Sequence, residues 1–245
     1  MTSNVNNLQK KTISSIIPML KHCAKKKHLN EGSKIHANIL RNGLLERSPH
    51  IGSSLVSMYA KCGDFKKSQE VFDELQFKGN NNISSWNALI GGYILHGKEE
   101  EALVCFHQMK YNEGIPPDSI TFSCILKACA NTRDIFKGRE IHDEIVKLDL
   151  VKKDVVLATA LVDMYAKCGQ INKAEEVFFE IRVRNIVSWN ALITGYAQHG
   201  LVEKAWGCVL HMQREGISPD AITFACILKA CGNTSAIEEG EKIHN

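Results

Sequence analysis

The chain has 245 residues, of which 44% are hydrophobic and 23% charged, with a formal net charge of +3. This composition is typical of a folded protein, and five prolines and 17 glycines are too few for a disordered or fibrous chain. No run approaches about 18 consecutive apolar residues, so we expect no membrane-spanning helix.

The N-terminal region is basic. Residues 1–48 hold nine Lys and Arg against Glu31 and Glu46, a balance of +7 that leaves −4 for the remainder. The run KHCAKKKH, residues 21–28, could contact phosphate groups or form a solvated helix face. The first twelve residues carry no acid and no Arg and are short for a transit peptide.

Three phrases occur twice when the chain is searched for internal periods. They are MYAKCG at Met58 and Met164, WNALI at Trp86 and Trp189, and ITFSCILKAC at Ile120, which returns as ITFACILKAC at Ile222. The offsets are 106, 103 and 102 residues, in the same order in both copies. A superperiod near 104 residues therefore contains three unlike units of about 35 residues.

The phase of these phrases divides the chain into a tail, residues 1–12, and an array, residues 13–245. The units are 13–48, 49–82, 83–118, 119–154, 155–185, 186–220 and a partial seventh, 221–245. The second unit is three residues longer than the fifth, and the third is one residue longer than the sixth. We expect these insertions in loops. An array that ends within a unit is expected of a piece of a longer protein.

Each unit is expected to form two helices. Apolar residues at three- and four-residue steps predict a first helix in the fifth unit, capped by Gly169: Leu157, Leu161, Met164, Tyr165 and Cys168. A second amphipathic helix runs from Ile171 to Ile181, with Asn172 near its start. Gly63, Gly97 and Gly200 occupy the position of Gly169.

A hairpin of about 35 residues cannot bury both of its faces alone, so neighbouring hairpins must stack. The sequence therefore predicts an all-α fold, a right-handed α-solenoid of antiparallel helix hairpins. Stacking explains why Trp86 and Trp189 recur. It does not explain Asn87 and Asn190, because a polar amide beside a buried Trp has no packing reason to recur.

Neither the cysteines nor the histidines form a pattern typical of catalysis. The nine cysteines recur within the repeated phrases, and we interpret them as reduced, packed thiols. His36, His142, His244, His96 and His199 also recur, without partners at metal-ligand spacing. No phosphate-binding glycine loop, nucleophile triad, or deaminase HxE and PCxxC motifs appear. We expect no metal, no cofactor and no enzymatic activity.

Two repeat families have this period: tetratricopeptide repeats, which usually hold peptides, and pentatricopeptide repeats (PPR), which hold single-stranded RNA. Tetratricopeptide units keep a nearly constant length, whereas these units do not. With LVDMYAKCG, VSWNALITGYAQHG and ITFACILKACGNTSAIEEGEKIH, the array resembles the L, S and P units of PLS-class PPR proteins of plant organelles. The resemblance covers residues 13–245, beginning with an L unit. A tetratricopeptide-like, peptide-binding scaffold is the alternative.

The resemblance implies one reading site in each unit. The fifth residue contacts the Watson–Crick edge of a base, and the last residue of the unit supports it. The implied pairs are Ser53 with Asn82, Asn87 with Asp118, Ser123 with Asp154, Thr159 with Asn185, and Asn190 with Asp220. Asn with Asp favours U and a hydroxyl with Asn favours A, which gives the track A, U, an open base (nominally G), A, U.

Two further sets of residues follow from the resemblance. Aliphatic second residues clamp the bases, and those that fit are Ile120, Val156, Val187 and Ile222. Ser14, His50 and Ser84 do not fit, and Ile17, the fifth residue of the first unit, cannot hydrogen-bond. Lys61 and Lys167 match a position near the phosphate, or complement a helix C-terminus.

The resemblance implies sequence-specific binding of single-stranded organellar RNA by a monomer, at one base per unit. The role implied is guidance of RNA modification, C-to-U editing, or other transcript processing. A trans-acting deaminase or editing factor would then supply the chemistry. The implied location is the mitochondrion, with the chloroplast as the alternative.

Overall fold

The computed structural model describes residues 15–46, 48–80 and 82–234, and within these ranges every regular element is helical. Residues 15–26 form a helix that is followed by α2 (Leu29–Arg41). The next hairpins are α3 (Pro49–Cys62) with α4 (Phe65–Phe77), and α5 (Ile83–Leu95) with α6 (Glu99–His107) and the π-helical turn η1 (Gln108–Asn112). The expected tail and His244 lie outside the described residues.

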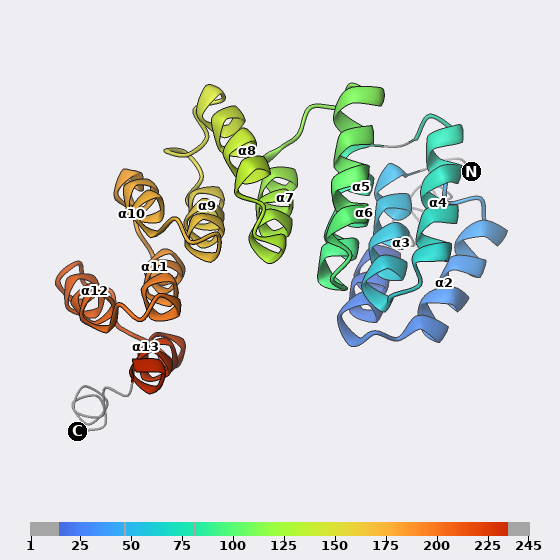
Figure 1. Ribbon diagram of the computed structural model, residues 1–245. Coiled ribbons are helices and arrows are strands. Elements are labelled where there is room, and N and C mark those ends of the chain that lie inside the picture. Colours follow the sequence, from blue (N-terminus) through green and yellow to red (C-terminus); the bar gives the residue numbers. More distant parts are fainter. Residues whose placement is uncertain (1–14, 47, 81, 235–245) are drawn as a thin grey trace. The chain divides into compact units, whose positions relative to one another are not determined.

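The remaining helices continue the same order (Figure 1). They are α7 (Ser119–Thr132), α8 (Ile135–Lys147), α9 (Val155–Lys167), α10 (Ile171–Glu180), α11 (Ile186–Gln198), α12 (Val202–Arg214) and α13 (Ala221–Thr234). From the second unit onward, each first helix begins at the residue where the repeat phase begins the unit. Asn172 lies inside α10, and the N-cap residue of this helix is Gln170.

The chain divides into two compact halves between Cys124 and Ile125, within α7. In the N-terminal half α3 packs against α5, while α4 and α6 each pack against the first helix of their own hairpin. In the C-terminal half α9, α11 and α13 pack in succession, with α10 and α12 on one side of them (Figure 1). Each half is therefore a stack of hairpins whose first helices form a continuous layer.

The repeated glycines allow the hairpins to turn and to approach one another. Gly169 has a φ of +79°, and Gly63, Gly97 and Gly200 are also in the left-handed region, which glycine adopts at no steric cost. A Cβ on Gly92 would lie 2.3 Å from the Cβ of Ala60. The equivalent contact of Gly195 is with Ala166, at 2.8 Å. The recurring Gly-Tyr phrase therefore marks close contact between successive first helices.

The two repeated tryptophans fill equivalent contacts between hairpins. Trp86 packs edge-on against Phe72 with ring centroids 4.6 Å apart, and Trp189 packs against Phe178 at 4.7 Å. Both indoles are at most 3% exposed. The prediction that stacking explains their recurrence is confirmed.

The extra residues of the longer units lie in helices, so the expectation that they lie in loops was wrong. The second helix of the second unit, α4, has 13 residues, and its counterpart α10 has 10. Three residues are almost one helical turn, so the longer helix ends on nearly the same face as the shorter one. The single extra residue of the third unit is absorbed by the π-helical turn η1, since such turns accommodate one-residue insertions.

Buried thiols and histidines join neighbouring hairpins. All nine cysteines are thiols, and burial raises the pKa of the Cys129 thiol to about 12, so it stays protonated. His36 Nδ1 lies 3.0 Å from the Tyr59 hydroxyl, and His142 Nδ1 lies 2.8 Å from that of Tyr165. These groups are structural contacts that recur with the repeat.

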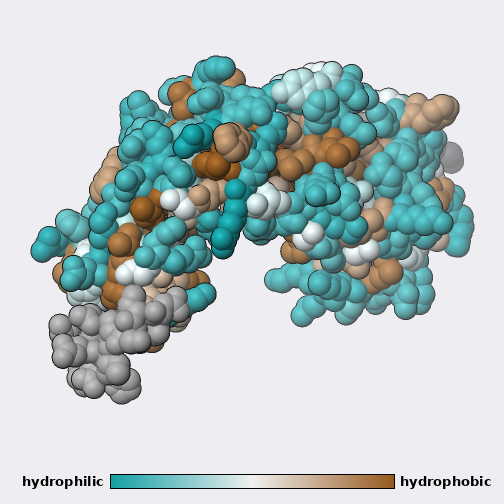
Figure 2. Space-filling model, viewed as in Figure 1, coloured by the Kyte–Doolittle hydropathy of each residue, from teal (hydrophilic) through white to brown (hydrophobic). Residues whose placement is uncertain are grey.

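The visible surface is mostly polar. In Figure 2 hydrophilic side chains dominate the face shown, and hydrophobic ones form separate patches. Phe77, Phe136 and Val183 are the most exposed large apolar side chains of the described residues, each at least 80% exposed. No helix of the described residues combines the length and the apolar character needed to cross a membrane.

Candidate nucleic-acid interface

In the third and sixth units, the fifth residue is hydrogen-bonded to the last. Asn87 lies in the second turn of α5, and its Nδ2 donates to Oδ1 of Asp118, 3.0 Å away. In the sixth unit Asn190 Nδ2 donates to Asp220 Oδ1 at 3.2 Å. The structure thus brings together both Asn–Asp pairs that the resemblance implied.

A threonine of the next unit completes each arrangement. Thr121 Oγ1 donates to Asn87 Oδ1 at 2.7 Å, and Thr223 Oγ1 donates to Asn190 Oδ1 at 2.6 Å. Both threonines are fully buried. We call each set of three an amide triad. The sequence did not indicate that the threonines contact the amides, although Asp-x-x-Thr resembles a helix-capping pattern and ITF recurs.

Each aspartate of a triad also caps a helix. Asp118 Oδ1 accepts from the Thr121 backbone N–H at 2.8 Å, and Asp220 Oδ1 accepts from that of Thr223 at 2.9 Å. The Thr223 backbone N–H, followed by the Thr223 hydroxyl and the Asn190 amide, lowers the pKa of Asp220. Asp220 is therefore an ionised acceptor at neutral pH.

The hydroxyl residues of the second and fifth units bond within their own helices. Ser53 Oγ donates to the His50 carbonyl at 3.2 Å, and Thr159 Oγ1 donates to the Val155 carbonyl at 2.6 Å. Their implied partners cap the following helices, where Asn82 Oδ1 accepts from Ser85 N–H and Asn185 Oδ1 from Ser188 N–H. In both units the hydroxyl proton is committed, which leaves the oxygen lone pairs as acceptors.

The fourth unit has neither a triad nor an amide. Ser123 is half-buried on α7, and the Asp154 side chain caps α9 by accepting from the N–H groups of Val156 and Leu157. The third residue of the following unit is Leu157, which offers no side-chain hydrogen bond. This unit therefore lacks the groups that fix an amide in the third and sixth units.

The four aliphatic residues implied as clamps are exposed to a similar degree. Each is the second residue of α7, α9, α11 or α13, and the exposures are 61% for Ile120, 67% for Val156, 62% for Val187 and 61% for Ile222. These exposed aliphatic side chains form an apolar surface at the same position of each of the four units. Ser84, at the same position of α5, is exposed and polar.

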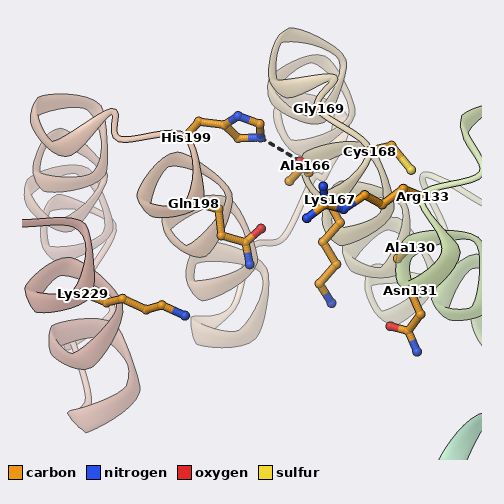
Figure 3. Close-up of a pocket in the computed structure, with 10 residues that line it drawn as sticks. All are labelled: Ala130, Asn131, Arg133, Ala166, Lys167, Cys168, Gly169, Gln198, His199 and Lys229. Carbon is orange, nitrogen blue, oxygen red and sulfur yellow. Dashed lines mark hydrogen bonds between the residues drawn. The ribbon is translucent and has the colours of Figure 1, made fainter. Parts of the chain in front are cut away.

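Basic residues lie at the C-terminal ends of first helices. Lys61, in the last turn of α3, is exposed. Lys167 ends α9, and its Nζ pairs with Asp163 Oδ2 at 2.8 Å. Lys167 also lines a hollow of about 640 Å³ together with Arg133 and Lys229 (Figure 3). The hollow is therefore lined by three cationic side chains.

A histidine holds the hairpins together beside this hollow. His199 Nε2 donates to the Ala166 carbonyl at 2.8 Å (Figure 3). Because a carbonyl can only accept, Nε2 must carry the proton. His96 lies 3.2 Å from the carbonyl of Lys61, one residue beyond the repeat equivalent of Ala166. Across the described residues, no three His, Cys, Asp or Glu side chains are grouped so that they could hold a metal ion.

Solved structures similar to this one include pentatricopeptide repeat proteins. The crystal structure of PPR10 in complex with an 18-nt psaJ RNA element has a TM-score of 0.75 at 20% identity, over 99% of this chain and 36% of that one. PPR10 from maize gives 0.65 at 21% identity, over 98% and 35%. Nuclear proteinaceous RNase P 2 from A. thaliana gives 0.50 at 15%, over 66% and 37%. These likenesses confirm the α-solenoid fold class of helix hairpins.

Two curated relatives come from Arabidopsis thaliana and are named as pentatricopeptide repeat-containing proteins. One is 34% identical over 94% of this chain and 27% of its own length. The other, named as chloroplastic, is 37% identical over 93% of this chain and 36% of its own length. The chain spans about a third of the length of these relatives.

Sequence models of the family match most of the repeats. The model described as the PPR repeat family matches residues 81–131 and 184–233. The model described as the PPR repeat matches residues 53–80, 120–150 and 156–186. Together with the hairpin fold and the two curated relatives, these matches show that the chain belongs to the pentatricopeptide repeat family.

Proposed function

We propose that this chain binds single-stranded RNA in a sequence-dependent way, with one base at each complete unit from the second to the sixth. The observation that carries the proposal is the amide triad, which occurs twice at the same repeat position. An amide held by a carboxylate at its nitrogen presents one donor and one acceptor, which can complement the edge of a uracil. The RNA-bound state named for the similar PPR10 structure supports the same role.

Base contacts in this proposal combine the amide with the exposed aliphatic residues. Val187 and Ile222 are the second residues of the sixth and seventh units and lie on either side of Asn190 in the sequence. Apolar contact with a base contributes roughly 1–3 kcal/mol. Lys61 and Lys167 would contact phosphate groups, so affinity should fall as salt rises.

The proposed track is A, U, an open base, A and U for residues 49–220. The test measures the affinity of the full chain for this RNA and for the same RNA with both U positions changed to A, at two salt concentrations. We expect weaker binding of the changed RNA, by about 10-fold or more if each base contributes as stated. Equal affinity for the two RNAs would overturn the proposed reading of bases.

Variants of the chain make the test specific. Asn190→Ala should remove the preference at the last U and leave the preference at the first. Asn172→Ala is the matched control, because Asn172 is an exposed asparagine on α10. A peptide-binding scaffold, the alternative function, would bind both RNAs equally weakly and show no change in either variant.

We propose further that RNA binding guides C-to-U editing or another step of transcript processing in an organelle, the mitochondrion or alternatively the chloroplast. The resemblance of the units to the L, S and P pattern supports this role. A deaminase or editing factor acting in trans would supply the chemistry. In plants that lack the protein, loss of one C-to-U conversion supports editing, whereas changed transcript ends or abundance with intact editing supports processing.

A further inference from the structure

The buried threonine of each amide triad occupies a position that no RNA can reach. Thr121 and Thr223 are both 0% exposed, yet each hydroxyl lies within 2.7 Å of an asparagine Oδ1. The hydroxyl also belongs to the helix cap, because it accepts from the aspartate backbone N–H at 3.3 Å in Thr121 and 3.2 Å in Thr223, and lies 2.9 Å from the aspartate Oδ1 in both. The shorter contact of each hydroxyl is the one with the asparagine Oδ1, at 2.7 Å and 2.6 Å, which a helix cap does not require.

We propose that Thr121 and Thr223 are positioning residues that hold the asparagine amides in one orientation, and that this orientation sets the preference for uracil over cytosine. The proposal rests on the proposed function. The aspartate can only accept, so it attracts the amide nitrogen, and the threonine donates to the amide oxygen. One contact at each end fixes both the direction and the plane of the amide.

The orientation matters because uracil and cytosine present opposite groups. Uracil offers the N3–H donor beside the O4 acceptor, whereas cytosine offers the N3 acceptor beside the N4 amino donor. A base in a fixed position therefore pairs with the amide in one direction if it is uracil and in the reversed direction if it is cytosine. A reversed amide would lose its bond to the aspartate and bring its Oδ1 against the carboxylate, and the threonine hydroxyl would have to turn its proton away from the amide.

The threonine occurs where the preceding unit has an asparagine as its fifth residue. In the units that follow the third and the sixth, the third residue is a threonine, Thr121 or Thr223. In the unit that follows the fourth, the third residue is Leu157. After the second and fifth units it is Ser85 or Ser188, whose hydroxyl donates to the carbonyl of the preceding asparagine. The third residue therefore differs with the kind of reading residue in the unit before it.

The surroundings of Asn190 provide a matched control. Thr194 lies one turn further along α11, and its hydroxyl donates to the backbone carbonyl of Asn190 at 2.6 Å. Thr194 thus contacts the same residue without touching its amide. Replacing Thr194 with Val changes a neighbouring hydroxyl of Asn190 and leaves the triad intact.

The experiment measures the affinity of the chain for two RNAs that differ only by U or C at the position assigned to Asn190. Thr223→Val should lower the ratio of U to C affinity by about 3-fold or more, as expected for the loss of one neutral hydrogen bond. Thr223→Ser, which keeps the hydroxyl, and Thr194→Val should retain the ratio. Because the readout is a ratio, a loss of stability that weakens both RNAs equally does not imitate the effect.

The outcomes separate this inference from the proposed function. If the unmodified chain prefers U and Thr223→Val keeps the same ratio, the threonine does not position the amide and the inference is overturned. If the unmodified chain binds U and C equally, the proposed reading of uracil fails, and the inference fails with it. Thr121→Val, with the RNA changed at the position of Asn87, repeats the test if Thr223→Val does not fold.

Discussion

The third and sixth units place the same amide triad in different surroundings. Asn87 is half-buried, whereas Asn190 is 8% exposed. The residue one turn further is Gly91 in α5 and Thr194 in α11. The hydrogen bonds of the two triads nevertheless differ in length by at most 0.2 Å. The triad therefore depends on its own three residues and on stacking of adjacent units, and tolerates changes around it.

The two units differ more clearly in what accompanies the triad. The sixth unit has Val187 at its second position, and Trp189 Nε1 donates to Glu215 Oε2 at 3.2 Å. The third unit has Ser84 instead, and its Trp86 Nε1 is buried without a hydrogen-bond partner in the described part of the chain. The sixth unit is thus the more complete copy, and we expect it to contribute more both to RNA affinity and to stability.

The largest expected effect concerns the close helix contacts of the two copies. Gly92→Ala would place a Cβ 2.3 Å from Ala60 Cβ and 3.3 Å from its Cα, so a backbone would have to move. Gly195→Ala is less severe, with contacts of 2.8 Å to Ala166 Cβ and 3.2 Å to an Ile171 methyl group. Overpacking costs roughly 1–3 kcal/mol, and we expect Gly92→Ala near the top of this range.

Urea denaturation of both variants tests this prediction. Gly207→Ala in α12 is the control, because no atom lies within 4 Å of its added Cβ and alanine favours helix. Gly207→Ala should be neutral or stabilising. A Gly92→Ala variant as stable as Gly207→Ala would contradict the close packing of α3 and α5.

Exchange of the second residues tests whether the clamp position distinguishes the copies. Val187→Ser should weaken RNA binding by about 1 kcal/mol or more, and Ser84→Val should strengthen it, because each contact with a base contributes roughly 1–3 kcal/mol. Filter binding with the proposed RNA measures both. Val183→Ser is the control, since Val183 is 80% exposed but lies in the loop before α11. Unchanged affinity in both exchange variants would exclude a clamp.

The two tryptophans allow the indole hydrogen bond to be measured by difference. Trp86→Phe and Trp189→Phe both remove similar volume from similar packing, but only Trp189→Phe loses a hydrogen bond. We expect Trp189→Phe to cost about 1 kcal/mol more in the free energy of unfolding. Equal costs in denaturation experiments would show that the bond to Glu215 contributes nothing to stability.

The smallest effect is a dependence of stability on pH. Burial lowers the pKa of His36 and of His142 below the ordinary value of 6.5. The unfolded chain therefore binds more protons near pH 6, and stability should fall as the pH drops below 6.5 toward the lowered pKa values. His142→Gln should reduce the slope of unfolding free energy against pH between 5 and 7, whereas Asn172→Gln, which replaces an exposed side chain of α10 that does not titrate, should leave it unchanged.

The sequence contained most of the fold because the repeat phase locates helix starts. Asn82, Asp154 and Asn185 each stand directly before a first helix, and the phase of the repeated phrases ends a unit at each of them. The location of the inserted residues could not be read in this way. Helix α4 and the turn η1 absorb them through backbone geometry, which a comparison of unit lengths does not contain.

The candidate site was predicted in part. The Asn87 and Asn190 partners followed from the family resemblance, but Thr121 and Thr223 did not. Thr121 lies 34 residues from the amide that it contacts, so its role depends on how two hairpins stack. The hydroxyls of Ser53 and Thr159 were expected to face a base, and the structure adds that their protons are already donated to their own helices.

The five residues that end the second to sixth units all begin the next helix with a side-chain bond to its backbone, and all five are Asn or Asp. Replacing such a residue by alanine typically costs about 1 kcal/mol. Under the proposed function, a change of RNA target at these positions would therefore be limited to residues that initiate helices well. The fifth residues do not cap a helix and are therefore freer to vary. Changes of RNA specificity, in evolution or by engineering, should therefore occur mainly at the fifth residues.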